Sequence, residues 1–250
     1  MSGHSKWSSI KHKKGAADAK RGKLFSKLTR AIIVAAREGG PDPDGNATLA
    51  TAIQKARDSS MPKDNIERAI ARGVGATAEG ESYETVTYEG YGAGGVAVFV
   101  EALTDNRNRT GSEVRHIFTK HNGSLGEPGS VAWQFEKKGI LLVDAERYSE
   151  DDLMVAIDAG AEDVGQDENV WEIVTEPGAL QEVRIALEGA GVELQNAELT
   201  MRPTTTVELD ESGAGKVLRL IEALDDQDDV NAVHANFEAD ADVLERVAAA

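Results

Sequence analysis

The apolar residues of this chain change their spacing at Gly73. Before that glycine they recur every three to four residues, which is the pattern of helices with one apolar face. We expect these helices over residues 16–38, 46–58 and 62–72. Beyond Gly73, β-branched and aromatic residues gather in short runs typical of strands, first over 83–88 and 96–103. The order predicts an α+β chain that opens with a three-helix bundle.

Residues 140–201 contain a complete supersecondary unit. Short apolar runs and amphipathic segments follow one another as strand, helix, strand, strand, helix, strand. Ser149 and Asp152 cap the first helix, and Pro177 opens the second. The strands are expected over 140–143, 161–164, 170–174 and 194–201. This order is that of the ferredoxin-like fold.

The segments on either side of that unit are too short to form independent cores. Before it, a capping box of Thr110 and Glu113 predicts a helix to His121, and residues 131–135 read as a strand. After it come a strand over 205–209, a helix containing Val217 and Leu224, and a strand ending near Phe237. We expect these pieces to join, so that the ferredoxin-like unit is an insertion. The predicted domains are a helical domain (1–76), a middle α/β sandwich (77–136 plus 204–250) and an inserted α/β sandwich (137–203).

Charge is divided unevenly along the chain. The first 37 residues carry ten Lys and Arg and a single acid, Asp18, a net charge of +9. The whole chain carries −17, so the remaining residues carry −26. A basic end on an acidic body indicates an arm that binds polyanions, and nucleic acid is the expected partner.

The residues predicted to bind nucleic acid lie mainly in this basic arm. They are Lys6, Trp7, Lys11, His12, Lys13, Lys14, Lys20, Arg21, Lys23, Lys27 and Arg30. The lysines and arginines would contact phosphates, and Trp7 would stack on a base. A solvated tail is the alternative. The tryptophan among the lysines, the continuation of the basic residues onto a helix and the acidity of the rest argue against it.

Residues 105–109 are a second candidate contact. Asp105, Asn106, Arg107, Asn108 and Arg109 lie between a buried strand and the predicted capped helix. The two arginines could bind phosphates and the asparagines could recognise base or ribose edges. Alternatively, the asparagines form the turn and the arginines pair with nearby acids. The sequence does not decide between these interpretations.

Patterns of catalytic, metal-binding and nucleotide-binding sites are weak. The chain has no cysteine, and its five histidines form no H-x-x-x-H pair. Residues 90–95 match G-x-G-x-x-G, but a strand follows where a dinucleotide site needs a helix. The carboxylates of residues 225–229 are better explained as a solvated acidic turn than as a cation site. We expect no catalytic residue, no metal, no cofactor and no small-molecule substrate, hence no enzyme.

Neither a membrane nor a secretory signal is indicated. No apolar run approaches the roughly 20 residues that a spanning helix needs, and the first residues are polar and charged. A cytoplasmic protein without a membrane partner is expected.

Several motifs resemble those of the YebC/PmpR family. They are the opening MSGHSKWSSIKHKK with Asp18 and RGKLFSK (21–27), PKDNIERAI (62–70), YEGYG (88–92), TDNRNRT (104–110), GSV (129–131) and ANF (235–237). The similarity extends over the whole chain. Two positions depart from the family pattern: Ala93 stands where proline is usual, which is expected to loosen the hairpin loop, and His234 stands where tyrosine is frequent.

The resemblance implies a helical N-terminal domain and a ferredoxin-like unit inserted in the middle domain. It also implies a DNA-binding transcriptional regulator of the cytoplasm, which is our first functional hypothesis. Relatives described as ribosome-associated translation factors, which assist elongation through stalling sequences, imply ribosomal RNA as the alternative target. A third hypothesis, a metal-dependent nuclease, would need a metal cluster that the sequence does not provide.

Overall fold

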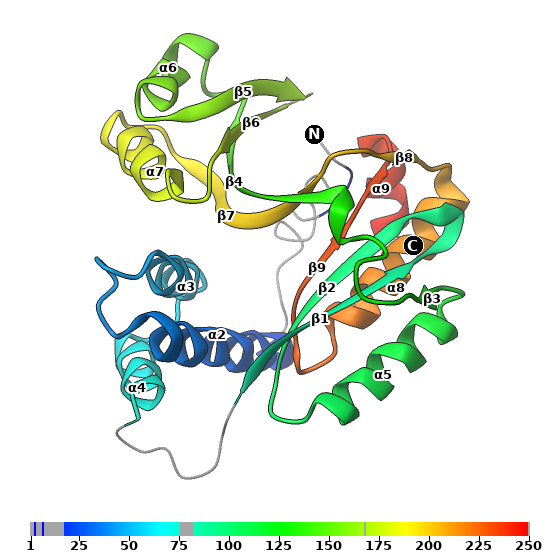
Figure 1. Ribbon diagram of the computed structural model, residues 1–250. Coiled ribbons are helices and arrows are strands. Elements are labelled where there is room, and N and C mark those ends of the chain that lie inside the picture. The colour runs from blue at the N-terminus through cyan, green and yellow to red at the C-terminus, as the bar shows by residue number, and fades with distance from the viewer. Residues whose placement is uncertain (1–2, 4–6, 8–17, 76–82, 168, 250) are drawn as a thin grey trace.

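The computed structural model describes residues 18–75, 83–167 and 169–249, together with Gly3 and Trp7. It has a helical domain, a middle domain built on one sheet and a second sheet domain inserted between strands of the first (Figure 1). The predicted α+β class and three-domain architecture are confirmed. None of the helices in these described ranges combines the length and apolar character needed to cross a membrane.

The helical domain consists of α2 (Asp18–Gly39), α3 (Ala47–Asp58) and α4 (Lys63–Gly73). Its core is an apolar cluster that includes Leu28, Ile32, Leu49, Ile53 and Ile66. The expected N-cap of α3 is confirmed, because the Asn46 side chain accepts a hydrogen bond from the backbone N–H of Leu49 at 3.1 Å. The close packing of α4 on α2 requires a glycine, since a Cβ on Gly73 would lie 2.6 Å from the carbonyl oxygen of Ile33.

The middle domain is built on an antiparallel sheet in the order β3-β1-β2-β9. Its strands are β1 (Glu84–Tyr91), β2 (Ala97–Thr104), β3 (Ser124–Leu125) and β9 (Val230–Ala235), and the short turn η1 (Ala93–Gly95) joins the first two. Two helices, α5 (Arg107–Lys120) and α8 (Glu211–Asp225), cover one face. Val98 and Val100 of β2 pack with Phe118 of α5 and Leu220 of α8 in its main core.

The other face of this sheet meets the segment that leads into the inserted domain. Ala97 and Phe99 of β2 pack there against Val131 and Phe135. The unbroken apolar run of β2 is therefore explained by cover on both faces, as the sequence predicted. The expected strand over 131–135 is wrong: residues 132–134 form the 3-10 turn η2 (Ala132–Gln134), and Phe135 begins the next strand.

Glu89 holds the loop between β3 and η2 in place. Its carboxylate accepts hydrogen bonds from the backbone N–H groups of Gly129, Val131 and Ala132 at 2.6, 2.7 and 2.8 Å. Burial opposes ionisation of this side chain, which is only 6% exposed, but the three backbone donors prevail and lower the pKa of Glu89. An acidic residue inside β1 thus substitutes for backbone pairing that the loop lacks.

The C-terminal residues return to the middle domain. A two-stranded parallel pair, β8 (Val207–Glu208) with β10 (Phe237–Glu238), lies beside the main sheet. The last helix, α9 (Ala241–Ala249), packs on α8 and buries Leu244. This helix was not predicted, although Val243, Leu244 and Val247 recur at helical spacing and pack on the core of the middle domain.

The inserted domain has the predicted ferredoxin-like order of elements. It comprises β4 (Phe135–Asp144), α6 (Glu150–Asp158), β5 (Ala161–Asp167), β6 (Val170–Thr175), α7 (Leu180–Gly189) and β7 (Leu194–Pro203). The sheet order is β5-β6-β4-β7, and both helices pack on one apolar cluster that includes Leu141, Leu153, Ile173 and Leu187. The capping box of Ser149 and Asp152 is present as expected.

Only two strands connect this domain to the middle domain. The pairing of β4 with β7 begins at Phe135, which lies opposite Pro203. The pairing of β4 with β6 begins four residues later, at Gly139. Residues 135–138 and 200–203 therefore form a two-stranded ribbon that leads out of the four-stranded sheet.

Candidate nucleic-acid interface

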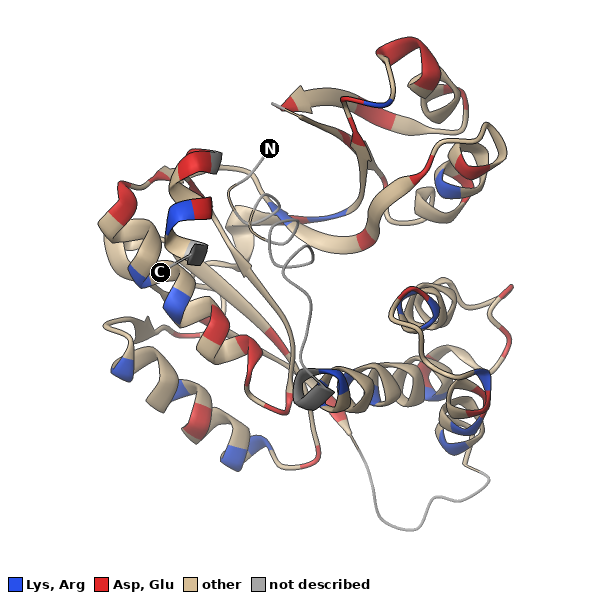
Figure 2. Ribbon diagram, turned by 180° about the vertical axis from the view of Figure 1, so that it is seen from behind, with Lys and Arg blue, Asp and Glu red and all other residues tan. Residues whose placement is uncertain are grey.

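Positive charge is concentrated in the helical domain. Residues 18–75 contain eleven Lys and Arg against seven Asp and Glu, whereas residues 83–250 contain twelve against 35. Figure 2 shows the acidic residues spread over the two sheet domains. The helical domain is therefore the part of the folded molecule best suited to meet a polyanion.

The structure places the arm residues unequally. Lys6, Lys11, His12, Lys13 and Lys14 lie outside the described residues, and Lys20 lies in the first turn of α2. Arg21 is exposed on the same helix. Three further cations, Lys23, Lys27 and Arg30, follow one side of α2 at i, i+4 and i+7, and are called here the basic stripe.

The predicted stacking role of Trp7 is wrong for this structure. Its side chain is only 6% exposed and belongs to the apolar core of the middle domain. A Cβ on Gly3 would lie 2.7 Å from the ring of Phe237, so both described residues of the N-terminal segment contact that domain. Burying an indole against aliphatic side chains is strongly favourable, and the ring has no free face for a base. The residues next to Trp7 in the sequence are polar or basic, so its burial in a distant core could not be predicted from them.

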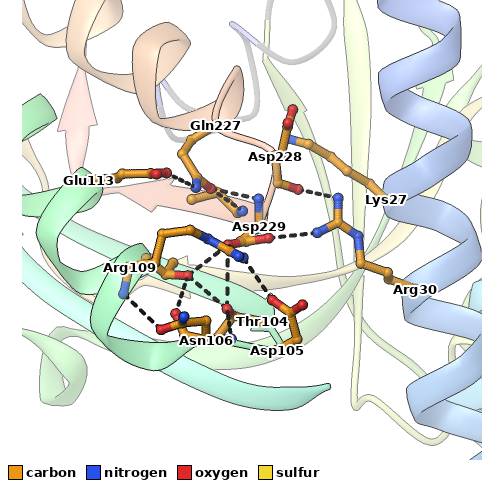
Figure 3. Close-up of polar contacts among 12 residues, drawn as sticks. Lys27, Arg30, Thr104, Asp105, Asn106, Arg109, Glu113, Gln227, Asp228 and Asp229 are labelled. Carbon is orange, nitrogen blue, oxygen red and sulfur yellow. Dashed lines mark hydrogen bonds and ion pairs between the residues drawn. The ribbon is translucent and has the colours of Figure 1, made fainter. Parts of the chain in front are cut away.

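The basic stripe faces the protein's own carboxylates. Residues 225–229, which join α8 to β9 and are called here the acidic turn, lie against α2 (Figure 3). The Lys23 ammonium lies 3.1 Å from the carbonyl oxygen of Asp226 and 3.6 Å from the carboxylate of Asp228. Lys27 contacts the carbonyl oxygen of Asp225 and, at 3.9 Å, its carboxylate. In this structure the cations of the basic stripe, which were predicted to contact phosphates, therefore contact the acidic turn instead.

Asp229 is the centre of this contact. It is 5% exposed and accepts hydrogen bonds from Arg30 at 2.8 Å, from Arg109 at 2.7 Å and from the Thr110 hydroxyl at 2.7 Å. Burial would raise the pKa of Asp229, but the hydrogen bonds from Arg109 and Thr110 and the charges of Arg109 and Arg30 lower it. The carboxylate therefore stays ionised and links α2, α5 and the acidic turn.

A glutamine fixes the shape of the acidic turn. The side-chain oxygen of Gln227 accepts hydrogen bonds from the backbone N–H groups of Asp229 and Val230 at 2.7 and 2.8 Å (Figure 3). Its amide nitrogen donates to Glu113 of α5 at 2.7 Å. The turn is thus held on the middle domain independently of its contacts with α2.

The second predicted contact, residues 105–109, is part of this network rather than a loop. α5 begins at Arg107, and Asn106 caps it by accepting from the N–H of Arg109 at 3.1 Å. The expected capping box at Thr110 is wrong, because the Thr110 hydroxyl is buried against Asp229. Arg109 pairs with Asp105 and Asp229, which is the structural interpretation left open above. Arg107 differs, since its side chain is 68% exposed and lies 4.0 Å from Glu84.

Neutralising the central carboxylate should destabilise the protein measurably. Asp229→Asn replaces an acceptor with an amide donor that faces other donors, and we expect a loss of about 2 kcal/mol in the free energy of unfolding. Asp228→Asn changes a side chain that is 71% exposed and should stay within about 0.5 kcal/mol of the parent. Urea denaturation of the two variants checks this difference, and equal stabilities would contradict the role given to Asp229.

Other exposed cations of the helical domain were not anticipated. Arg57 on α3 and Lys63, Arg68 and Arg72 on α4 lie on its exposed surface. They are scattered among acids in the sequence, so no charge run marked them.

Comparisons with known proteins agree over the whole length of the chain. Residues 5–76 match the family model described as the TACO1/YebC protein N-terminal domain, and residues 83–237 match the TACO1/YebC second and third domain. A protein of Rubrobacter xylanophilus is 58% identical over 249 residues, covering 99% of this chain and all of that protein. One from Desulfosudis oleivorans is 59% identical over 237 residues, covering 94% of this chain and 96% of that protein. Both are named "Probable transcriptional regulatory protein".

A solved structure is also similar. The crystal structure of a conserved hypothetical protein from Aquifex aeolicus superposes with a TM-score of 0.78 at 54% sequence identity. The match covers 89% of this chain and 92% of that one.

Proposed function

The chain belongs to the TACO1/YebC family, and from that premise we propose that it is a non-enzymatic, nucleic-acid-binding regulatory protein of the cytoplasm. The basic arm and the helical domain make the contact, and the two sheet domains stay away from the phosphates. Regulation is the role that the names of the relatives carry.

The observation that carries the proposal is the separation of charge between domains. Residues 18–75 carry an excess of four positive charges, to which the lysines at 6, 11, 13 and 14 add, while residues 83–250 carry an excess of 23 negative charges. Phosphodiester chains attract the first part and repel the second. One end of the molecule is therefore oriented towards the ligand before contact is made.

Duplex DNA is the first target we propose, because the relatives are named as transcriptional regulators. In this form the protein controls transcription by binding near promoters. Contact through lysines and arginines alone would give affinity but little sequence discrimination, so a specific regulator must add base contacts.

Ribosomal RNA is the second target, favoured by the acidity of the sheet domains. A body that carries 35 acids against twelve bases over residues 83–250 is poorly suited to lie along a duplex. A positively charged end that enters a cleft between RNA helices avoids this repulsion. In this form the protein is a translation factor that assists elongation.

Binding across a salt series distinguishes the two targets. A protein that neutralises Z phosphates of a duplex loses affinity with a log–log slope near −0.9Z, and near −0.7Z for single strands. Sequence-dependent binding to promoter DNA that persists at physiological salt supports transcription. Cosedimentation with ribosomes, combined with weak and sequence-independent duplex binding, supports translation. Failure to bind either target at low salt would contradict the proposed function.

A further inference from the structure

The basic stripe of α2 is covered by the acidic turn in this structure. We infer that the acidic turn is an intramolecular inhibitor: it occupies the phosphate-binding face of α2, and a nucleic acid has to displace it to bind fully. This inference rests on the proposed function and specifies how that function is regulated.

The contacts of the turn resemble those that a phosphodiester chain would make. Arg30 bonds the carboxylate of Asp229 and the carbonyl oxygen of Asp228 with different nitrogens of its guanidinium group. Lys23 similarly meets a carbonyl oxygen and a carboxylate. Phosphate groups offer the same kind of anionic oxygen acceptors, and a forked guanidinium suits them well.

The turn can be released without breaking an apolar core. The apolar cluster of the helical domain consists of residues from α2, α3 and α4 with Met61 and Tyr83. The main cluster of the middle domain contains no residue from these three helices. The pair of Lys23 and Asp228, 54% and 71% exposed, is weak and screened by salt. The contact between stripe and turn is therefore ionic, and ionic competitors act on it.

Opening does not leave the buried carboxylate of Asp229 without partners. When Arg30 leaves, Asp229 keeps its hydrogen bonds from Arg109 and Thr110. Gln227 still holds the backbone of the turn. The cost of opening therefore falls on the three cations of α2, for which a bound polyanion supplies other anions. It also falls on the ion pairs of Lys55 with Glu198 and of Asp58 with Arg184, which join the helical domain to the inserted domain.

The basic arm strengthens this competition. It precedes α2 directly in the sequence, so a nucleic acid held by the arm is presented to the stripe at a high effective concentration. Initial capture by the arm followed by displacement of the turn gives a two-step binding reaction. The second step requires the conformational change that displaces the turn.

Neutralising the three acids of the turn other than Asp229 tests the inference. The variant Asp225→Asn/Asp226→Asn/Asp228→Asn keeps Asp229 and its network. The control Glu150→Gln/Asp151→Asn/Asp158→Asn removes the same charge from α6 of the inserted domain. Fluorescence anisotropy is measured with a uridine homopolymer of about 30 nucleotides and with a duplex of similar length. We expect the turn variant to bind about tenfold more tightly than the parent, and the control to change affinity by less than about twofold.

A distance measurement reports opening without relying on binding. The chain has no cysteine, so Ala71→Cys on α4 and Thr119→Cys on α5 place two labels, both at exposed positions, on the helical and middle domains. We expect the distribution of distances between the two labels to become broader and its mean to become longer in the turn variant without ligand. The same change is expected in the parent protein with saturating RNA. The control should keep the parent's distance.

The inference requires both results. Equal affinities of turn variant and control, or an unchanged distance in the turn variant, would overturn it while the proposed function stands. Absence of binding to RNA, duplex and ribosomes by every variant removes the proposed function and the inference together.

Discussion

Replacing Lys11, Lys13 and Lys14 with glutamate is expected to lower the affinity for nucleic acid by on the order of 100-fold at physiological salt. These lysines lie outside the described residues, whereas Lys23, Lys27 and Arg30 of α2 meet the acidic turn. Loss of three phosphate contacts should also make the slope of log affinity against log salt concentration less negative by roughly three.

A matched variant separates local contact from net charge. Lys120→Glu/Lys216→Glu/Arg219→Glu makes the same charge change at exposed positions of α5 and α8. It should alter affinity by less than about tenfold and leave the salt slope nearly unchanged, because long-range effects are screened. Anisotropy titrations at four or more salt concentrations provide both values. If the two variants lose affinity equally, the arm is not the contact.

Glu89→Ala should be among the most destabilising single substitutions in the middle domain. It leaves the N–H groups of Gly129, Val131 and Ala132 without their acceptor. The buried donor of Val131 costs about 1–3 kcal/mol when unpaired, and the two partly buried donors cost less each. We expect a loss of about 4 kcal/mol in the free energy of unfolding, moderated by water that enters the loop. Glu127→Ala, an exposed change in the same loop, should stay within about 0.5 kcal/mol of the parent.

The effect of Glu89 should depend on pH in a defined direction. Its folded-state pKa is lowered, whereas the unfolded chain has a value of about 4.3. The stabilisation is therefore complete above about pH 4.3 and is lost as pH falls through the folded-state value. Denaturation curves at pH 7 and at successively lower pH should show the parent and Glu89→Ala converging. A difference that stays constant to low pH would show that the carboxylate charge is not the cause.

Local signals predicted those parts of the fold in which neighbouring residues determine structure. The cap at Asn46, the capping box at Ser149 and the ferredoxin-like order of elements could be predicted because each depends on short spacings. The same reasoning failed at Thr110. A motif that matches a capping box is there overridden by Asp229, a residue 119 positions away that takes the threonine hydroxyl.

The candidate interface could be predicted only in part. The charge of the arm and the spacing of the basic stripe are properties of the sequence, but the pairing of Arg30 with Asp229 joins residues 199 positions apart. Trp7 shows the same limit, since its burial depends on a core assembled from α5, α8 and β9. Contacts between residues far apart in the chain produce no periodic pattern in the sequence from which they could be predicted.

The ribbon formed by residues 135–138 and 200–203 restricts how the inserted domain can move. Two paired strands twist and flex easily but hardly stretch, because hydrogen bonds and the covalent chain fix their length. The ribbon is also fixed to the middle sheet, because the Thr200 hydroxyl and the N–H of Met201 lie 3.2 and 3.4 Å from Nδ1 of His234 on β9. The inserted domain also contacts α3 of the helical domain through two ion pairs, Glu198 of β7 with Lys55 at 3.2 Å and Arg184 of α7 with Asp58 at 3.2 Å. A ligand that rotates the helical domain would pull on both, so torsion at one end of the molecule is transmitted to the other.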